Sequence, residues 1–157
     1  MPIPDFVVEL RKLVGQSELW MPAVTAVVRR RDDVLLVRRA DNDAWAPVTG
    51  ILDPGEDPAV AATRETLEET GVTIRVDRLA SVGAGDRNRV THVNGDLAAY
   101  LDLTFACSWV SGEPVVADDE SVDVRWWSAD ALPDLHPVLV ERIEAALSGE
   151  ERTRFWT

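Results

Sequence analysis

The feature of this sequence that most constrains its fold is a helix predicted in the middle of the chain, between two sets of strands. Asp57 and Pro58 are typical of the cap and the first residue of a helix, and Gly71 stands where a glycine ends one. Strand-forming segments come before and after this helix, and another helix follows the last strand. A chain with this order is expected to fold as an α/β (α+β) protein, an α/β/α sandwich with a central mixed β-sheet.

The strands and the outer helices are predicted from apolar spacing and turn residues. Strands are expected at residues 23–28, 34–37, around Trp45, and at 73–82, 89–93, 97–109 and 122–127. Asn94 and Gly95 predict a hairpin between the fifth and sixth of these strands. One helix is expected at about residues 5–14 and another at about 137–148. No repeat or linker divides the sequence, so we expect a single domain over residues 1–157.

The charge of the chain restricts what it can bind. It has 16 Lys and Arg against 28 Asp and Glu, which gives a formal net charge of −12. Such a chain repels the phosphate backbone of DNA and RNA, so we expect no nucleic acid polymer as a partner. A small ligand that carries phosphates would need a cation beside it.

Neither a membrane nor a disulfide is expected. The longest apolar stretches, such as residues 23–28, are far shorter than the roughly 20 residues that span a bilayer. The N-terminus lacks the basic leader and apolar run of a signal peptide, so we expect a cytoplasmic protein. Cys107, the only cysteine, lies in an apolar run and is expected to be a buried thiol rather than a nucleophile.

The predicted central helix carries a group of acids. At 100° per residue, the face that we expect to pack inward carries Val60, Thr63 and Leu67. Almost opposite lie Glu65 and Glu69, with Glu68 beside them. Glutamates four residues apart repel each other, and a hard divalent cation would relieve this because Mg²⁺ binds carboxylates and substrate phosphates. The alternative is a solvated acidic face with Arg64 as its counterion.

The loop before this helix favours the metal interpretation. Residues 50–72 read GILDPGEDPAVAATRETLEETGV and resemble the Nudix box, a loop, helix and loop with fixed glycine, arginine and glutamate positions. The positions that match are Gly50, Glu56, Arg64, Glu65, Glu68, Glu69, Gly71 and Val72. Thr66 departs from the pattern, because the family usually has an aliphatic residue there. It is expected on the inward side of the helix, where it affects packing more than chemistry.

The resemblance implies a reaction and its residues. Nudix domains hydrolyse a nucleoside diphosphate linked to another group X, with water attacking phosphorus and Mg²⁺ or Mn²⁺ neutralising the phosphates. By this resemblance Glu65 and Glu69 are the main metal ligands and Glu68 is an auxiliary one, and the backbone carbonyl of Thr49 joins the metal shell. Arg64 would orient Glu65. Three other residues that match the box would brace the loop: Gly50, Glu56 and Gly71.

The general base of such a domain is sometimes a glutamate of the box and sometimes an acid on a later loop. Glu120 is our first candidate for that later acid, as a catalytic residue and a metal ligand, followed by Asp119 and Asp118. All three precede the strand that contains Trp126. The alternative for this segment is a solvated turn.

Three further residues are candidates for binding the substrate. Arginines concentrate at positions 29–31 and 38–39, and we predict that Arg38 contacts a phosphate. Alternation puts Arg38 and Arg39 on opposite faces of a strand, so only one of them can face a given site. Trp45 and Trp127 are candidates for stacking a nucleobase, and the alternative for both is packing in the core. The expected partner is a small nucleoside diphosphate derivative, whose identity the sequence leaves open.

Two rival functions share the family's fold. A Nudix domain can act as a ligand sensor or interaction module without turnover, but a binding module has no chemical need for the full set of box acids. Isomerisation of an isoprenoid diphosphate calls for a catalytic cysteine, and Cys107 is poorly placed for that role. Homodimers are common in such folds, although no segment of this chain specifies an interface.

Overall fold

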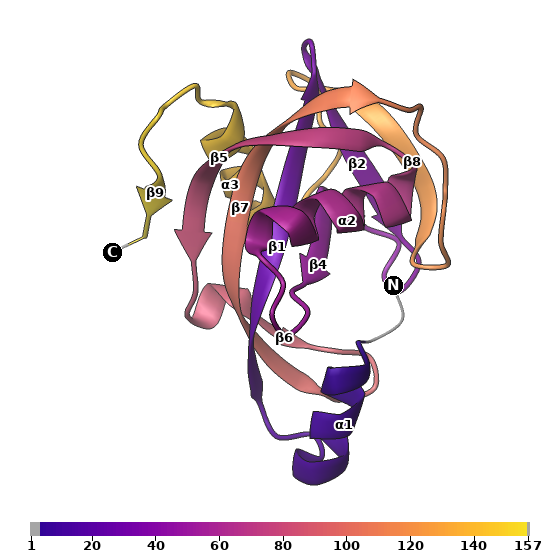
Figure 1. Cartoon of the computed structure of the whole chain (residues 1–157), viewed down its shortest axis with the longest axis vertical. Coiled ribbons are helices and arrows are strands. Elements are labelled where there is room, and N and C mark those ends of the chain that lie inside the picture. The colour runs from indigo at the N-terminus through magenta and orange to yellow at the C-terminus, as the bar shows by residue number, and fades with distance from the viewer. Residues whose placement is uncertain (1–3, 157) are drawn as a thin grey trace.

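The computed structural model describes residues 4–156 and shows a sheet with helices packed on it (Figure 1). The helices are α1 (Asp5–Val14), α2 (Pro58–Thr70) and α3 (Pro137–Leu147), together with the short 3-10 helix η1 (Asp86–Asn88). The strands are β1 (Leu19–Arg30), β2 (Asp33–Arg39), β3 (Trp45–Ala46), β4 (Val48–Ile51), β5 (Thr73–Gly83), β6 (Arg89–Thr91), β7 (Leu97–Ser111), β8 (Ser121–Ser128) and β9 (Arg154–Phe155).

The sheet is mixed, as predicted. Its main path runs β3-β2-β1-β7-β5-β9, and β4, β6 and β8 pair with β1, β7 and β2. The long central strands β1 and β7 run parallel from the pair Leu19 and Ala98 to the pair Arg29 and Ser108. Most other pairs are antiparallel, including the hairpin of β6 and β7, where Gly95 adopts a φ of 87°. A glycine takes this left-handed conformation without strain, which is why Asn-Gly predicts a hairpin.

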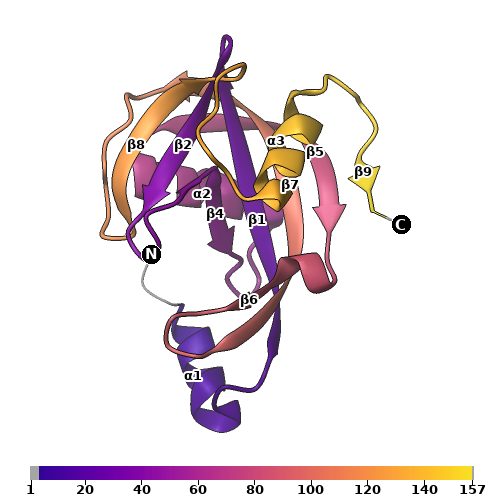
Figure 2. The same cartoon turned by 180° about the vertical axis from the view of Figure 1, so that it is seen from behind.

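Helices α2 and α3 cover opposite faces of the sheet (Figures 1 and 2). Consecutive residues of β2 point to opposite faces, so Leu35 packs in the cluster with Ala61 and Ala62 of α2. Leu36, the next residue, packs in the cluster with Ile143 of α3. Helix α1 lies at one end of the sheet, where Val7 packs on Met21 and Ala98. The predicted α/β/α arrangement is therefore confirmed.

The predicted inward face of α2 is wrong. Val60 and Leu67 are 56% and 50% exposed, whereas Glu65 and Glu69 are 0% and 4% exposed. The face that meets the sheet carries small residues instead: Ala61, Ala62, Thr66 and Thr70 are buried. Small side chains let the helix approach the sheet closely. This close approach, rather than the burial of the largest apolar residues, determines which face of α2 packs on the sheet. Thr66 does point inward, as expected, and its hydroxyl donates to the carbonyl of Ala62 at 2.7 Å.

Smaller differences concern the ends of elements. β6 ends at Thr91 rather than Val93, and β1 begins at Leu19, four residues before the predicted start. Asp57 occupies the cap position of α2 but its side chain makes no capping hydrogen bond. Over residues 4–156, none of the helices is both long enough and apolar enough to cross a membrane.

Candidate metal and catalytic site

Arg64 joins the loop before α2 to the acids on the helix. Its Nε and Nη2 donate to the two oxygens of Glu56, each at 2.8 Å, and Glu56 Oε2 also accepts from the backbone N–H of Asp53 at 3.1 Å. Arg64 Nη1 lies 3.0 Å from Glu65 Oε1 and 3.2 Å from Glu68 Oε2. The planar guanidinium thus bridges three carboxylates and fixes the loop against the helix.

Glu65 is fully buried against β4. A Cβ atom on Gly50 would lie 2.2 Å from both Cδ and Oε1 of Glu65, so only glycine leaves room for this carboxylate. Thr49, whose backbone carbonyl is a candidate metal ligand, directly precedes Gly50 in β4. Within the described part of the chain neither carboxylate oxygen has a hydrogen-bond partner of good geometry, even though Arg64 is close. Burial raises the pKa of Glu65 to about 7, against the opposing effect of the Arg64 charge.

Glu69 lies one turn further along the same face and is almost as buried. Burial raises its pKa to about 8, and the negative charges of Glu65 and Asp118 add to this rise, while the charge of Arg39 opposes it. Glu68 differs from both, because its side chain is 50% exposed and is held by Arg64. The structure therefore brings two buried carboxylates together and leaves the third at the rim.

The donor set fits a hard divalent cation. Glu65 and Glu69 supply carboxylate oxygens. Burial disfavours their negative charges, and a bound cation would compensate this cost. Two carboxylates match Mg²⁺ better than Zn²⁺, because Mg²⁺ prefers oxygen ligands and commonly takes one or two carboxylates, completing its shell with water and substrate phosphates.

Residues 112–120, which we call the strap, lie along the C-terminal end of α2. The backbone N–H of Val115 donates to Thr70 O at 3.0 Å, and that of Ala117 donates to Glu69 O at 3.2 Å. At the far end the carbonyl of Glu120 accepts from the N–H of Ala40 at 2.7 Å. Gly71, with a φ of 69°, ends α2 here, and its N–H donates to Leu67 O. The strap brings the later acids, Asp118, Asp119 and Glu120, to the helix end that carries Glu69.

The negative charge of Asp118 is among the main causes of the raised pKa of Glu69. Its Oδ1 accepts from the backbone N–H of Glu120 at 3.0 Å, which fixes the carboxylate within the strap. Asp119 is exposed, and Asp118 and Glu120 are half-buried. Glu120 is the first candidate from the sequence, although all three acids share the position before β8 on which that choice rests.

The structure does not bring Arg38, Trp45 or Trp127 together with the glutamates. Arg38 pairs with Asp43 and stands opposite Trp45 in the β2–β3 ladder. The rings of Trp45 and Trp127 pack edge to face, with centroids 5.2 Å apart, in the cluster under α3. They therefore lie on the face of the sheet away from α2.

Arg39 interacts with the site instead, and sequence analysis did not select it. Its Nε and Nη2 bind the two oxygens of Asp41, each at 3.0 Å. Its positive charge acts on Glu69. The alternation of β2 showed that only one of Arg38 and Arg39 could face the site, but it did not show which one. The β-bulge between these two residues adds to that ambiguity.

Cys107 is a core thiol, as expected. It is 3% exposed, and burial raises its pKa to about 12. We expect the folded protein not to react with a thiol reagent such as a disulfide dye at pH 8, because the reagent cannot reach Cys107 and the thiol stays protonated at this pH. The unfolded protein in denaturant is the control and should react fully. Rapid modification of the native protein would contradict the buried placement.

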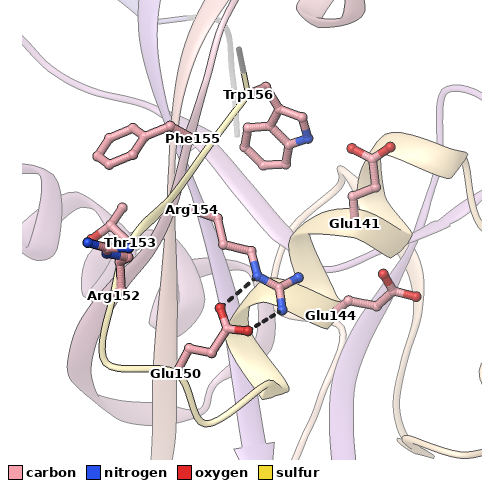
Figure 3. Close-up of a pocket in the computed structure, with 8 residues that line it drawn as sticks. All are labelled: Glu141, Glu144, Glu150, Arg152, Thr153, Arg154, Phe155 and Trp156. Carbon is pink, nitrogen blue, oxygen red and sulfur yellow. Dashed lines mark hydrogen bonds and ion pairs between the residues drawn. The ribbon is translucent and has the colours of Figure 1, made fainter.

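A cavity of about 570 Å³ lies on another part of the molecule, between α3 and the residues that follow it (Figure 3). Glu150 binds Arg154 there through two contacts of 3.0 and 3.1 Å, so this arginine is already neutralised. Glu144 and Arg152 line it too, as does Glu141, which is paired with Arg87. The cavity adjoins α3, which lies on the opposite face of the sheet from α2, so we do not assign it to the site of Glu65 and Glu69.

Comparisons with known proteins agree with this geometry. The NUDIX domain model matches residues 19–146. The NAD-capped RNA hydrolase NudC of Pseudomonas aeruginosa is 34% identical over 116 residues, which cover 73% of this chain and 38% of that protein. A MutT-like protein of Streptomyces ambofaciens is 33% identical over 129 residues, covering 81% of this chain and 77% of that protein. The chain thus matches well under half the length of NudC.

Solved structures share the fold. A UDP-X diphosphatase superposes with a TM-score of 0.70 at 24% identity, covering 96% of this chain and 73% of that one. A NUDIX hydrolase from Nitrosomonas europaea gives a TM-score of 0.68 at 28% identity, covering 86% and 93%. The family model covers most of the chain, including every position of the box and the whole sheet around it except the short β9. The chain therefore belongs to the Nudix family.

Proposed function

We propose that this chain is a divalent-metal-dependent hydrolase that cleaves the pyrophosphate linkage of a nucleoside diphosphate joined to a second group, by attack of water on phosphorus. The observation that carries the proposal is the buried pair Glu65 and Glu69. Both have raised pKa values, and neither oxygen of Glu65 has a well-formed hydrogen bond among the described residues. Burying two acids so close together is costly, and the cost is offset once a cation binds.

The residues of the chain have distinct parts in this proposal. Glu65 and Glu69 would hold Mg²⁺ or Mn²⁺, with Glu68 as an auxiliary ligand and the backbone carbonyl of Thr49 as a further one. When bound, the metal would neutralise the phosphates and lower the pKa of the attacking water. Arg64, itself held by Glu56, keeps Glu65 in place.

The proton of the attacking water passes to an acid of the strap. Asp118 is the first candidate because its charge reaches Glu69, and Glu120 is the second. Separate Asp118→Asn and Glu120→Gln variants distinguish them. A carboxylate that acts as the base must be deprotonated, so its ionisation produces the acidic limb of the pH–rate profile. The variant that lacks the base should lose this limb, while the other variant retains it.

Arg39 is proposed to bind a substrate phosphate in place of Arg38. We expect Arg39→Met to raise the Michaelis constant about tenfold, because a charge-assisted contact to phosphate is lost. Arg38→Met is the matched control, one residue away in the same strand, and should change the Michaelis constant less than twofold. Steady-state kinetics on the two variants check this. A large effect of Arg38→Met with none of Arg39→Met would overturn the assignment.

The names of the relatives suggest which compounds to test. The panel comprises NAD, ADP-ribose, a UDP-sugar, a nucleoside triphosphate and a short RNA with a 5′ NAD cap, each with Mg²⁺, Mn²⁺ or chelator. The capped RNA tests the expectation, drawn from the charge of −12, that no nucleic acid polymer is bound. Products identified by mass spectrometry, formed only with metal and lost in Glu69→Gln, are the expected result. Nucleotide binding with no product, by folded and metal-loaded protein, would favour the sensor function instead.

A further inference from the structure

Arg30 lies between the two strands that flank the strap. Its guanidinium carbon is 4.2 Å from the ring centroid of Trp126 in β8 and 5.6 Å from that of Trp109 in β7. β7 ends directly before the strap and β8 begins directly after it, as the right-hand side of Figure 1 shows. Contact with two aromatic faces leaves the guanidinium little freedom, so it presents a fixed positive charge at the strap.

That charge binds the start of the strap. Arg30 Nη1 lies 3.1 Å from each carboxylate oxygen of Glu113. The side chain of Arg30 is 26% exposed and that of Glu113 is 75% exposed, so the pair contributes little to the stability of the whole protein. Its effect is local, because Glu113 stands two residues before Val115, the first strap residue bonded to α2.

Two further features hold the backbone next to Glu113 close to the end of α2. Trp109 Nε1 donates to the carbonyl of Gly112 at 2.8 Å. Gly112 has a φ of 91°, and a Cβ atom there would lie 2.5 Å from the carbonyl oxygen of Gly71. The strap therefore leaves β7 in contact with the end of α2, and the pair of Arg30 and Glu113 fixes its direction toward Thr70 and Glu69.

We propose that Arg30 is a positioning residue, which holds the strap against α2 through Glu113 and so keeps Asp118 beside Glu69. Its importance for turnover rests on the proposed function. Its role in holding the strap is independent of the proposed function, because that role depends only on the contacts among four residues: Arg30, Glu113, Trp109 and Trp126.

The first test measures the strap directly, without any substrate. Amide hydrogen exchange at Val115 and Ala117 reports the bonds to Thr70 and Glu69. Arg30→Met and Glu113→Gln should each speed this exchange, by up to about fivefold, the upper end of the effect expected when one exposed ion pair is removed. Arg154→Met, which removes another arginine–glutamate pair at the far edge of the sheet, is the control and should leave it unchanged. Unchanged exchange in both strap variants would overturn the proposal.

The second test separates positioning from general packing. In a double-mutant cycle, Arg30→Met with Glu113→Gln should lower kcat no further than either single change, because both remove the same interaction. The Michaelis constant should stay within twofold, and Arg30→Lys should recover part of kcat. Additive losses in kcat, or a changed Michaelis constant with normal kcat, would contradict a positioning role. If the wild type hydrolyses nothing in the panel, the proposed function fails, and the exchange result still decides whether Arg30 holds the strap.

Discussion

Glu69→Gln is expected to stabilise the metal-free protein at pH 8.5 while abolishing turnover. The pKa of Glu69 is about 8 in the folded chain against 4.5 for an ordinary glutamate. Between these pH values the unfolded chain binds fewer protons than the folded one, so the stability of the metal-free wild type falls as pH rises from about 4.5 to about 8. Glutamine cannot ionise, so the variant does not lose this stability as the pH rises. The gain at pH 8.5 is on the order of 2–4 kcal/mol, or roughly 4–10 °C in Tm.

Thermal unfolding of both proteins at pH 5 and pH 8.5, in chelator, checks this prediction. The difference between variant and wild type should shift in favour of the variant from the lower pH to the higher one. With millimolar Mg²⁺ or Mn²⁺ the order should reverse, because only the wild type is stabilised by bound metal. Turnover should fall on the order of 100-fold or more. A pH-independent difference in Tm would show that Glu69 is not held in the neutral form.

Gly50→Ala is expected to lower activity severely although it replaces no charged residue. The new methyl group would meet Cδ and Oε1 of Glu65 at 2.2 Å, well inside contact distance, so the carboxylate must move. Glu65 is fully buried and held by Arg64, so moving it also costs stability, about 1–3 kcal/mol. We expect turnover on the order of 100-fold lower.

Gly55→Ala is the matched control for Gly50→Ala. Gly55 lies in the loop that joins β4 to α2 and has a φ of 89°, but a Cβ atom there would meet no heavy atom within 4 Å. This change strains the backbone by about 1 kcal/mol and leaves Glu65 untouched, so turnover should be retained. Kinetics and thermal unfolding of the two variants give the comparison. Wild-type turnover in folded Gly50→Ala would show that the close contact of Gly50 and Glu65 does not matter for the reaction.

The sequence predicted the fold where local chemistry determines it. The bounds of α2 follow from Pro58 at its first position and Gly71 after its end, and the hairpin of β6 and β7 follows from Asn94-Gly95. The face of α2 could not be predicted in this way. Hydrophobicity favoured burial of Val60 and Leu67, whereas close packing of alanine and threonine on the sheet buried Glu65 and Glu69 instead.

The site shows the same division. The contacts of Arg64 with Glu56, Glu65 and Glu68 lie within one loop and helix, and the box pattern implied the contact with Glu65. Arg39 and the strap reach the site only through tertiary structure. The position of Arg39 depends on which side of β2 faces α2. The position of the strap depends on the path of a nine-residue connection, which the spacing of apolar residues does not predict.

Calorimetric titration of Mn²⁺ into the protein at pH 6.5, in buffers with different ionisation enthalpies, tests the central claim most directly. Glu65 and Glu69, with pKa values of about 7 and about 8, are mostly protonated at this pH, so binding should release about one to two protons per metal ion. Glu69→Gln should bind far more weakly and release fewer protons. Absence of binding by the wild type, binding without proton release, or equal binding by Glu69→Gln would contradict the claim that this buried carboxylate pair is the metal site.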